Sequence, residues 1–119
     1  MDTAQIIVAV MDQWRLGIDA HDPGRVAGAF TEDAVFQGLR PYGVGRQVVA
    51  DYYNSQPAGM RVEYRILESR RPADHVVLGY LAATFSYPDR PAVELAIGVV
   101  LTRDGERWQV AQYQASLLL

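Results

Sequence analysis

The feature that most limits the possible folds of this chain is a change of hydrophobic period near residue 60. Before that point, apolar residues recur at spacings of three and four, as in Ile7, Val10, Met11 and Trp14, which predicts a helix with one buried face. From Met60 onward, apolar and polar residues alternate as they do in half-buried strands. Helices followed by a run of strands predict an α+β fold, with helices covering one face of a curved, mostly antiparallel sheet.

Capping and turn residues predict where the elements begin and end. Asp2 or Thr3 can cap the first helix, and Asp22 followed by Pro23 can start a second, short helix that continues to Phe30. Thr31-Glu32-Asp33 is predicted to be a turn that leads into a brief strand, and the glycines and proline of residues 38–45 predict an irregular loop. The remaining predicted elements are a helix over 46–54 and strands that begin at 60, 75, 92 and 107.

Length, charge and composition narrow the possible functions. The 119 residues are enough for one domain, residues 1–119, and the net charge of −3 has no basic cluster that would suit a nucleic acid. The absence of Cys excludes disulfides and thiolate chemistry. No apolar run is long enough to span a membrane, and the first residues lack the basic start of a secretory signal. We therefore expect a cytoplasmic protein that binds neither membranes nor nucleic acid.

The last two strands predict which side chains face the helices. If Asp104 and Gly105 form a two-residue turn, Ile97 lies opposite Gln112 and Leu95 lies opposite Gln114 on the large, apolar face. A buried amide without a partner costs about 1–3 kcal/mol, so both glutamines need hydrogen bonds there. They can bond to the backbone or to each other, or they can line a cavity and bind a ligand.

The hairpin around residues 88–91 adds a tyrosine to the same face. With a four-residue loop, Tyr80 lies opposite Val99 and points inward. Tyr80 is then either a core ring whose hydroxyl reaches the rim or the proton donor of a site. We select Tyr80 as the candidate catalytic residue.

Aromatic residues of the helical half predict the walls of a pocket. Rings at helical spacing usually belong to a core, but the many tyrosines and glutamines suit an apolar ligand that carries a few oxygen atoms. The candidate substrate-binding residues are Trp14, Phe36, Tyr42 and Tyr52, together with Gln112 and Gln114.

Few residues of the sequence favour a cofactor or a metal. His21 and His75 are far apart and have no metal-ligand spacing, and the two glycines of Gly43-Val44-Gly45 are too little for a dinucleotide motif. We predict no cofactor and no metal. No carboxylate is placed on the inward sheet face, so acid–base chemistry would depend on Tyr, His or the ligand's own groups.

Three segments resemble motifs of the NTF2-like (cystatin-like) superfamily. They are Val26 to Phe36, which is similar to the "LF-T-DA-F" entry of these domains, Gly45 to Val49, which is similar to the start of their third helix, and Arg103 to Ala111, which is similar to their final hairpin. Together they look most like the SnoaL-like and SgcJ/EcaC-type members from actinobacterial polyketide and enediyne biosynthesis. The resemblance implies a cone-shaped fold with three N-terminal helices on the concave face of the sheet.

The resemblance leaves two functions open. One is a polyketide cyclase, isomerase or dehydratase of secondary metabolism that needs no cofactor and acts on an apolar, oxygen-bearing substrate. The other is a non-catalytic accessory or carrier protein for a biosynthetic enzyme. In the family's isomerases, the oxyanion-hole tyrosine would align near Trp14 of this chain and the catalytic base near Gly38. Neither Trp14 nor Gly38 can take the corresponding role.

Small residues predict a surface for self-association. Gly98, Ala96 and Ala111 fall on the outward face of the predicted sheet, where small side chains allow two sheets to pack closely. We expect a homodimer that forms through this face.

Overall fold

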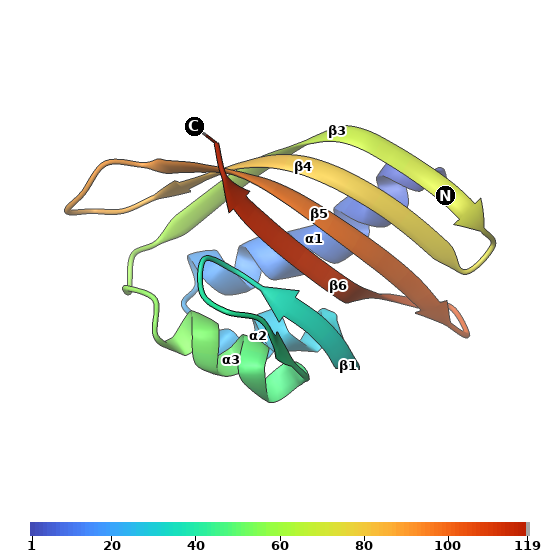
Figure 1. Cartoon of the computed structure of the whole chain (residues 1–119), viewed down its shortest axis with the longest axis horizontal. Helices are drawn as coiled ribbons and strands as arrows, with labels where there is room; N and C mark the ends of the chain where they lie inside the picture. Colours follow the sequence, from blue (N-terminus) through green and yellow to red (C-terminus); the bar gives the residue numbers. More distant parts are fainter. Residues whose placement is uncertain (119) are drawn as a thin grey trace.

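The computed structural model describes residues 1–118 and has helices packed on one curved sheet (Figure 1). The strand order is β2-β1-β6-β5-β4-β3, and every pair is antiparallel except β1 and β6. This is the predicted α+β fold. The elements are α1 (Thr3–Asp19), α2 (Pro23–Gly28), β1 (Phe30–Gln37), β2 (Gly43–Val44), α3 (Arg46–Asn54), β3 (Arg61–Ala73), β4 (Val76–Ser86), β5 (Val93–Asp104) and β6 (Arg107–Leu117).

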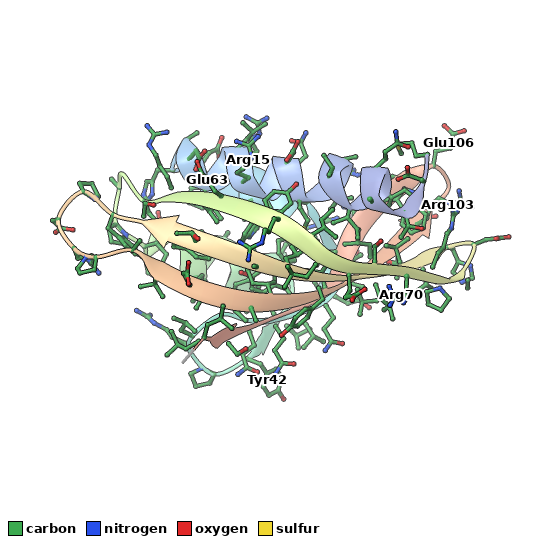
Figure 2. The ribbon with its side chains drawn as sticks, turned by 90° about the horizontal axis from the view of Figure 1, so that it is seen from above. Arg15, Tyr42, Glu63, Arg70, Arg103 and Glu106 are labelled. Carbon is green, nitrogen blue, oxygen red and sulfur yellow. The ribbon has the colours of Figure 1, made fainter. Side chains whose placement is uncertain are left out.

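The helices begin where their capping residues predict. The Asp2 carboxylate accepts a hydrogen bond from the Gln5 N–H, and the Gln5 side chain accepts one from the Asp2 N–H, each at 2.8 Å. Asp22 caps α2 in the same way, by accepting from the Arg25 N–H at 3.1 Å. Figure 2 shows α1 running along the sheet beside β3, with Arg15 of the helix close to Glu63 of the strand.

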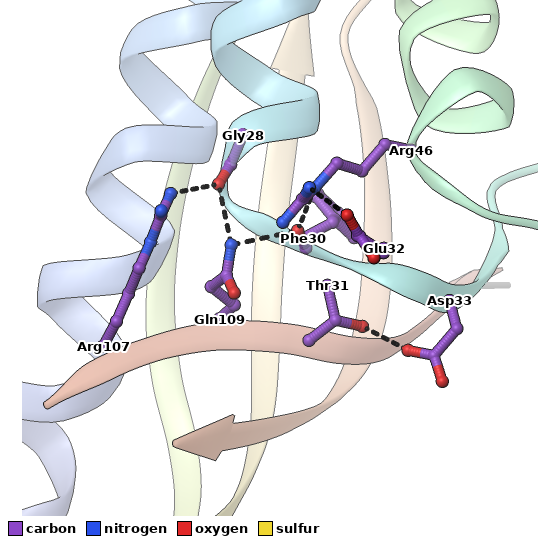
Figure 3. A network of polar contacts seen from close by, with 8 residues as sticks. All are labelled: Gly28, Phe30, Thr31, Glu32, Asp33, Arg46, Arg107 and Gln109. Carbon is purple, nitrogen blue, oxygen red and sulfur yellow. Dashed lines mark hydrogen bonds and ion pairs between the residues drawn. The ribbon is translucent and has the colours of Figure 1, made fainter. Parts of the chain in front are cut away.

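The start of β1 differs from the prediction, because Phe30 and residues 31–33 are strand rather than helix and turn. Side chains from β6 and α3 hold this segment extended (Figure 3). The Gln109 amide donates to the carbonyls of Gly28 and Phe30, the Arg107 guanidinium also donates to Gly28, and Arg46 donates to Phe30 at 2.8 Å. These partners are distant in sequence, so local propensity gave no sign of them.

The predicted register of β5 and β6 is wrong along the whole hairpin, and in the distal half of β6 the predicted inward face is wrong as well. The turn lies at Gly105 and Glu106, where Gly105 has a φ of 61°, so Asp104 pairs with Arg107 and Leu101 with Val110. A β-bulge at Ala111 then makes Val100 pair with Gln112. An extra residue in one strand reverses which of its later side chains face the core.

The predicted register of β4 and β5 is also wrong, by one residue. Tyr80 pairs with Gly98 rather than with Val99, and Phe85 pairs with Val93. A one-residue slip turns every side chain of a strand to the other face, so Val77, Leu81 and Phe85 point inward and Tyr80 points outward.

The helices are also the elements to test for a membrane span. Within residues 1–118, no helix is both long enough and apolar enough to cross a membrane.

The core fills the space between the helices and the concave face of the sheet. The buried stripe of α1 is the predicted one, and it packs against the inward residues of β4, β5 and β6. These inward residues are Val77, Leu81, Ala83, Phe85, Leu95, Ile97, Val99, Leu101, Val110, Tyr113 and Ala115.

Candidate functional site

Aromatic rings from several elements meet between α1, α3 and the sheet. Phe36 of β1 stacks on Tyr113 of β6, with centroids 4.9 Å apart and an interplanar angle of 18°. Trp14 of α1 lies edge-on to Phe85 of β4 at 5.9 Å, and Tyr53 of α3 lies edge-on to Phe36 at 5.7 Å. Rings are less deformable than aliphatic chains, and such pairs add about 0.5–1.5 kcal/mol beyond burial. This cluster is therefore a rigid wall.

Three polar atoms in this wall form a short hydrogen-bonded chain. The Trp14 indole Nε1 donates to the Tyr53 hydroxyl at 2.9 Å, and the hydroxyl oxygens of Tyr53 and Tyr113 share a hydrogen bond at 3.5 Å. The three groups carry three hydrogens, but the chain has only two bonds. Whichever tyrosine donates to the other, one hydroxyl hydrogen has no acceptor in this chain.

The two tyrosines border a cavity of about 220 Å³. It lies between the end of β1, the C-terminal part of α3 and the ends of β4, β5 and β6. Tyr52 forms one side, where its ring lies so close to Gly38 that a Cβ there would overlap it, and its hydroxyl accepts from the Leu39 N–H at 3.3 Å. The lining residues are Gly38, Leu39, Arg40, Tyr52, Tyr53, Gln56, Met60, Phe85, Tyr87, Val93, Leu95, Tyr113 and Ala115.

The cavity is rich in hydrogen-bond donors and has no general base. Its lining, all within residues 1–118, includes no Asp, Glu or His, and Arg40 is its one charged residue. Burial raises the pKa of Tyr53 and of Tyr113, so both hydroxyls are neutral at physiological pH and act as donors. No group of three His, Cys, Asp or Glu side chains in the described part of the chain could hold a metal ion. The arrangement can bind and polarise an oxygen atom of a ligand.

Three of the predicted site residues belong to this region. Tyr52 lines the cavity. Trp14 and Phe36 lie behind its wall, where Trp14 donates to Tyr53 and Phe36 stacks on Tyr113. All three lie where a role in forming the pocket is possible, and that role stays a prediction.

Four predicted site residues lie outside the cavity. Tyr42 is 67% exposed in the loop before β2, and Figure 2 shows it at the outer margin of the molecule. Tyr80 is 47% exposed, and Gln112 and Gln114 are exposed on the same outward face of the sheet. The slip in β4 and the bulge at Ala111 put them there, so the inward placement on which their assignment rested is wrong.

The cavity also has lining residues that the sequence analysis did not select. Tyr113 lies between Gln112 and Gln114, so the predicted register puts its side chain on the outward face, but the bulge turns it inward, where it is 2% exposed and lines the cavity. Tyr53 follows Val49 at helical spacing, and both side chains are buried. The spacing of this pair is the sequence pattern that indicates that Tyr53 faces the core. Arg40 and Gln56 lie beyond element ends, and no pattern pointed to them.

Comparisons with known proteins establish the fold. The sequence matches no protein-family model and no curated protein sequence. It is similar in structure to a ketosteroid isomerase-like protein from Erwinia carotovora atroseptica, at 21% identity and a TM-score of 0.81, over 97% of this chain and 95% of that one. An NTF-2 like protein of unknown function from Shewanella oneidensis matches at 11% identity and a TM-score of 0.82, over 95% and 98%.

A third similar structure is a putative scytalone dehydratase from Novosphingobium aromaticivorans. Its identity to this chain is 14% and the TM-score is 0.79, over 98% of this chain and 84% of that chain. Identities this low show the fold alone, which is NTF2-like. The same fold carries proteins of different function, so the site has to support the functional argument.

Proposed function

We propose that this protein binds a small apolar molecule through an oxygen atom that accepts a hydrogen bond from Tyr53 or Tyr113. The observation that carries the proposal is the unmatched hydroxyl hydrogen of these two tyrosines, which are both buried and both line the cavity. A buried donor without an acceptor costs about 1–3 kcal/mol. A ligand carbonyl or similar oxygen would recover that free energy.

The size of the cavity limits what it can enclose. A volume of about 220 Å³ equals the liquid volume of roughly seven water molecules and lies below the ~300–1,000 Å³ of sites for drug-sized ligands. One substituted ring fills it. A multi-ring polyketide would therefore place one ring inside and the remainder beyond the mouth.

The proposed setting is secondary metabolism, and the reaction, if one occurs, is a cyclisation, isomerisation or dehydration that needs no cofactor. The motifs similar to SnoaL-like and SgcJ/EcaC-type proteins support this setting, and the isomerase-like and dehydratase neighbours share the fold. Because the lining has no carboxylate or imidazole, catalysis here would work by positioning the substrate and polarising its carbonyl. The alternative is an accessory or carrier protein that binds the same ligand without changing it.

Acetophenone and ethylbenzene test the binding proposal, because they differ chiefly in one acceptor oxygen. We expect acetophenone to bind more tightly, with chemical shift changes in NMR spectra at Phe85 and Ala115. Either tyrosine alone would still hold one free hydroxyl hydrogen, so the test is the double variant Tyr53→Phe/Tyr113→Phe, which should weaken acetophenone about tenfold, corresponding to one hydrogen bond of about 1.4 kcal/mol. Tyr80→Phe is the matched control on the other face of the sheet. Equal binding of both probes to all three proteins would contradict the proposal.

Native mass spectrometry separates catalysis from carriage. The protein would be purified from its producing cells and the mass of any retained ligand measured. Incubation of that ligand, or of a synthetic copy, with fresh protein then shows whether it is converted. Conversion supports the enzyme, and unchanged ligand supports the carrier.

We also propose that the protein is a homodimer that associates through the outward face of the sheet. Val35, Leu78 and Tyr80 are exposed apolar side chains on this face, and a Cβ at Gly98 would meet no atom within 4 Å. Ala96 is only 4% exposed, so it contributes less than the sequence suggested. Gly98→Arg should convert a dimer to a monomer in sedimentation equilibrium, and a monomeric wild type at micromolar concentration would contradict the proposal.

A further inference from the structure

The one charged side chain of the cavity lining lies at the mouth. Arg40 follows β1 in the loop before β2, and its side chain is exposed. Four other arginines, Arg15, Arg46, Arg70 and Arg90, each lie within 4 Å of a carboxylate. Within residues 1–118, the Arg40 guanidinium forms no ion pair and no hydrogen bond. Its charge is therefore available to a ligand.

Two further donors lie on the same lining. Gln56, just beyond α3, is partly buried, and its carboxamide has no hydrogen bond to residues 1–118. The Tyr52 hydroxyl accepts from the Leu39 N–H, which leaves its own hydrogen for another acceptor. A guanidinium, an amide and a hydroxyl together suit an oxyanion, because an ionised acceptor makes hydrogen bonds about twice as strong as a neutral one.

The charge around the mouth is local and opposite to that of the whole molecule. The protein has a net charge of −3, so it does not attract anions as a whole. Arg90, which lies over the ring of the lining residue Tyr87 at 4.9 Å, is paired with Asp89 at 3.4 Å. Among the lining residues, the one positive charge is thus that of Arg40, and it has no paired carboxylate in residues 1–118.

We propose that the ligand is a small cyclic carboxylic acid whose ring fills the aromatic cavity and whose carboxylate meets Arg40 and Gln56 at the mouth. This inference rests on the proposed function, and it adds the charge of the ligand and its orientation. The ring contacts Phe85 and Tyr113, and the acidic group lies toward the loop after β1. A ligand amine at the same place would meet a like charge and no acceptor except the Gln56 carbonyl oxygen and hydroxyl oxygens.

Three probes with one carbon skeleton test the inference, namely 3-phenylpropionate, 3-phenylpropionamide and 3-phenylpropylamine. In calorimetry at low salt, we expect the acid to bind at least tenfold more tightly than the amide, and the amine to bind most weakly. Arg40→Gln should remove the preference for the acid and leave the affinity for the amide unchanged. Arg65→Gln is the matched control, because it makes the same change of charge at an exposed arginine of β3, away from the cavity.

The possible outcomes separate this inference from the function on which it rests. If acid and amide bind the wild type equally well, the charge preference is wrong while the proposed binding function stands. If none of the three probes binds but acetophenone does, the inference is wrong and the proposed function stands; if acetophenone does not bind either, the proposed function fails as well. A loss for Arg65→Gln as large as that for Arg40→Gln would show a general charge effect and overturn the inference.

Discussion

The two ends of the layer between helices and sheet are built from different side chains. At the end that we call the aliphatic end, Ile7 of α1 packs on Gly79 and Val99, close to Val77 and Leu101. At the other, the aromatic end, Tyr53, Phe85 and Tyr113 line the cavity, and Trp14 packs behind them. Branched aliphatic chains interdigitate and fill space, whereas rings fixed by edge contacts and hydrogen bonds leave space between them. The comparison teaches that one end of the core is filled, while the other leaves the cavity in which we propose that a ligand binds.

The largest expected effect is a loss of stability at the aliphatic end. Leu101 is fully buried, so Leu101→Ala should lower the free energy of unfolding by about 2–5 kcal/mol. The affinity for acetophenone should be unchanged, because Leu101 does not line the cavity. Urea unfolding and probe titration measure the two quantities. A fall of less than about 1 kcal/mol, or a parallel loss of affinity, would show that the two ends are not separate.

The next effect is a loss of stability at high pH that comes from the aromatic end. Burial raises the pKa of Tyr53 and of Tyr113 in the folded protein above the value of about 10 of an unfolded chain. As the pH rises, the unfolded state therefore releases these protons before the folded state does. The stability that the two protonated tyrosines contribute is fully present below pH 10 and decreases above it. Each tyrosine contributes about 1.4 kcal/mol per pH unit while only the unfolded form is ionised.

Urea unfolding between pH 8 and 11 measures this dependence. Above pH 10, Tyr53→Phe and Tyr113→Phe should each reduce the decrease of the free energy of unfolding with pH by about 1.4 kcal/mol per pH unit, which is the contribution of one tyrosine. A free energy of unfolding that stays constant from pH 9 to 11 would contradict the buried, hydrogen-bonded placement of the pair.

A smaller effect is expected where the cavity wall meets the loop after β1. A Cβ at Gly38 would overlap the Tyr52 ring, so Gly38→Ala should displace that ring and break its hydrogen bond to Leu39. We expect a loss of about 1 kcal/mol in stability, the value of one hydrogen bond, together with weaker probe binding. Gly28→Ala is the matched control, because a Cβ there meets no atom within 4 Å. If the two variants behave alike, Tyr52 does not shape the cavity.

Much of the fold could be predicted because its signals are local. The caps at Asp2 and Asp22, the buried stripe of α1 and the order of the helices and longer strands are set by neighbouring residues, and the structure confirms them. The prediction missed the two-residue strand β2, which lies in the segment expected to be an irregular loop. The buried face of β5 was also right, since Leu95, Ile97, Val99 and Leu101 alternate with smaller or polar residues. Periodicity within one strand is enough to predict such a face.

The candidate site could not be predicted to the same depth, because it depends on registers between strands. The bulge at Ala111 is set by contacts across the sheet, where β1 pairs with β6 in parallel and Tyr113 stacks on Phe36. The Gln112-Tyr113-Gln114 stretch of β6 has no apolar alternation that would reveal which face is buried. The sequence therefore predicted an aromatic pocket with few polar groups, and a cavity with aromatic lining is present, but the inward placement predicted for Tyr80 of β4 and for Gln112 and Gln114 of β6 is wrong.

The smallest expected effect tests that reassignment directly. With Gln112 exposed on the outward face, Gln112→Leu should change the free energy of unfolding by no more than about 0.5 kcal/mol and leave probe affinity unchanged. In the register predicted from a turn at Asp104-Gly105, Gln112 would face the core opposite Ile97, and the same substitution would replace a buried amide and alter the pocket. An altered affinity for acetophenone would therefore place Gln112 inside and remove Tyr113 from the cavity. Unchanged binding, together with weaker binding by the double variant Tyr53→Phe/Tyr113→Phe, would assign the two faces of β6 as the structure has them.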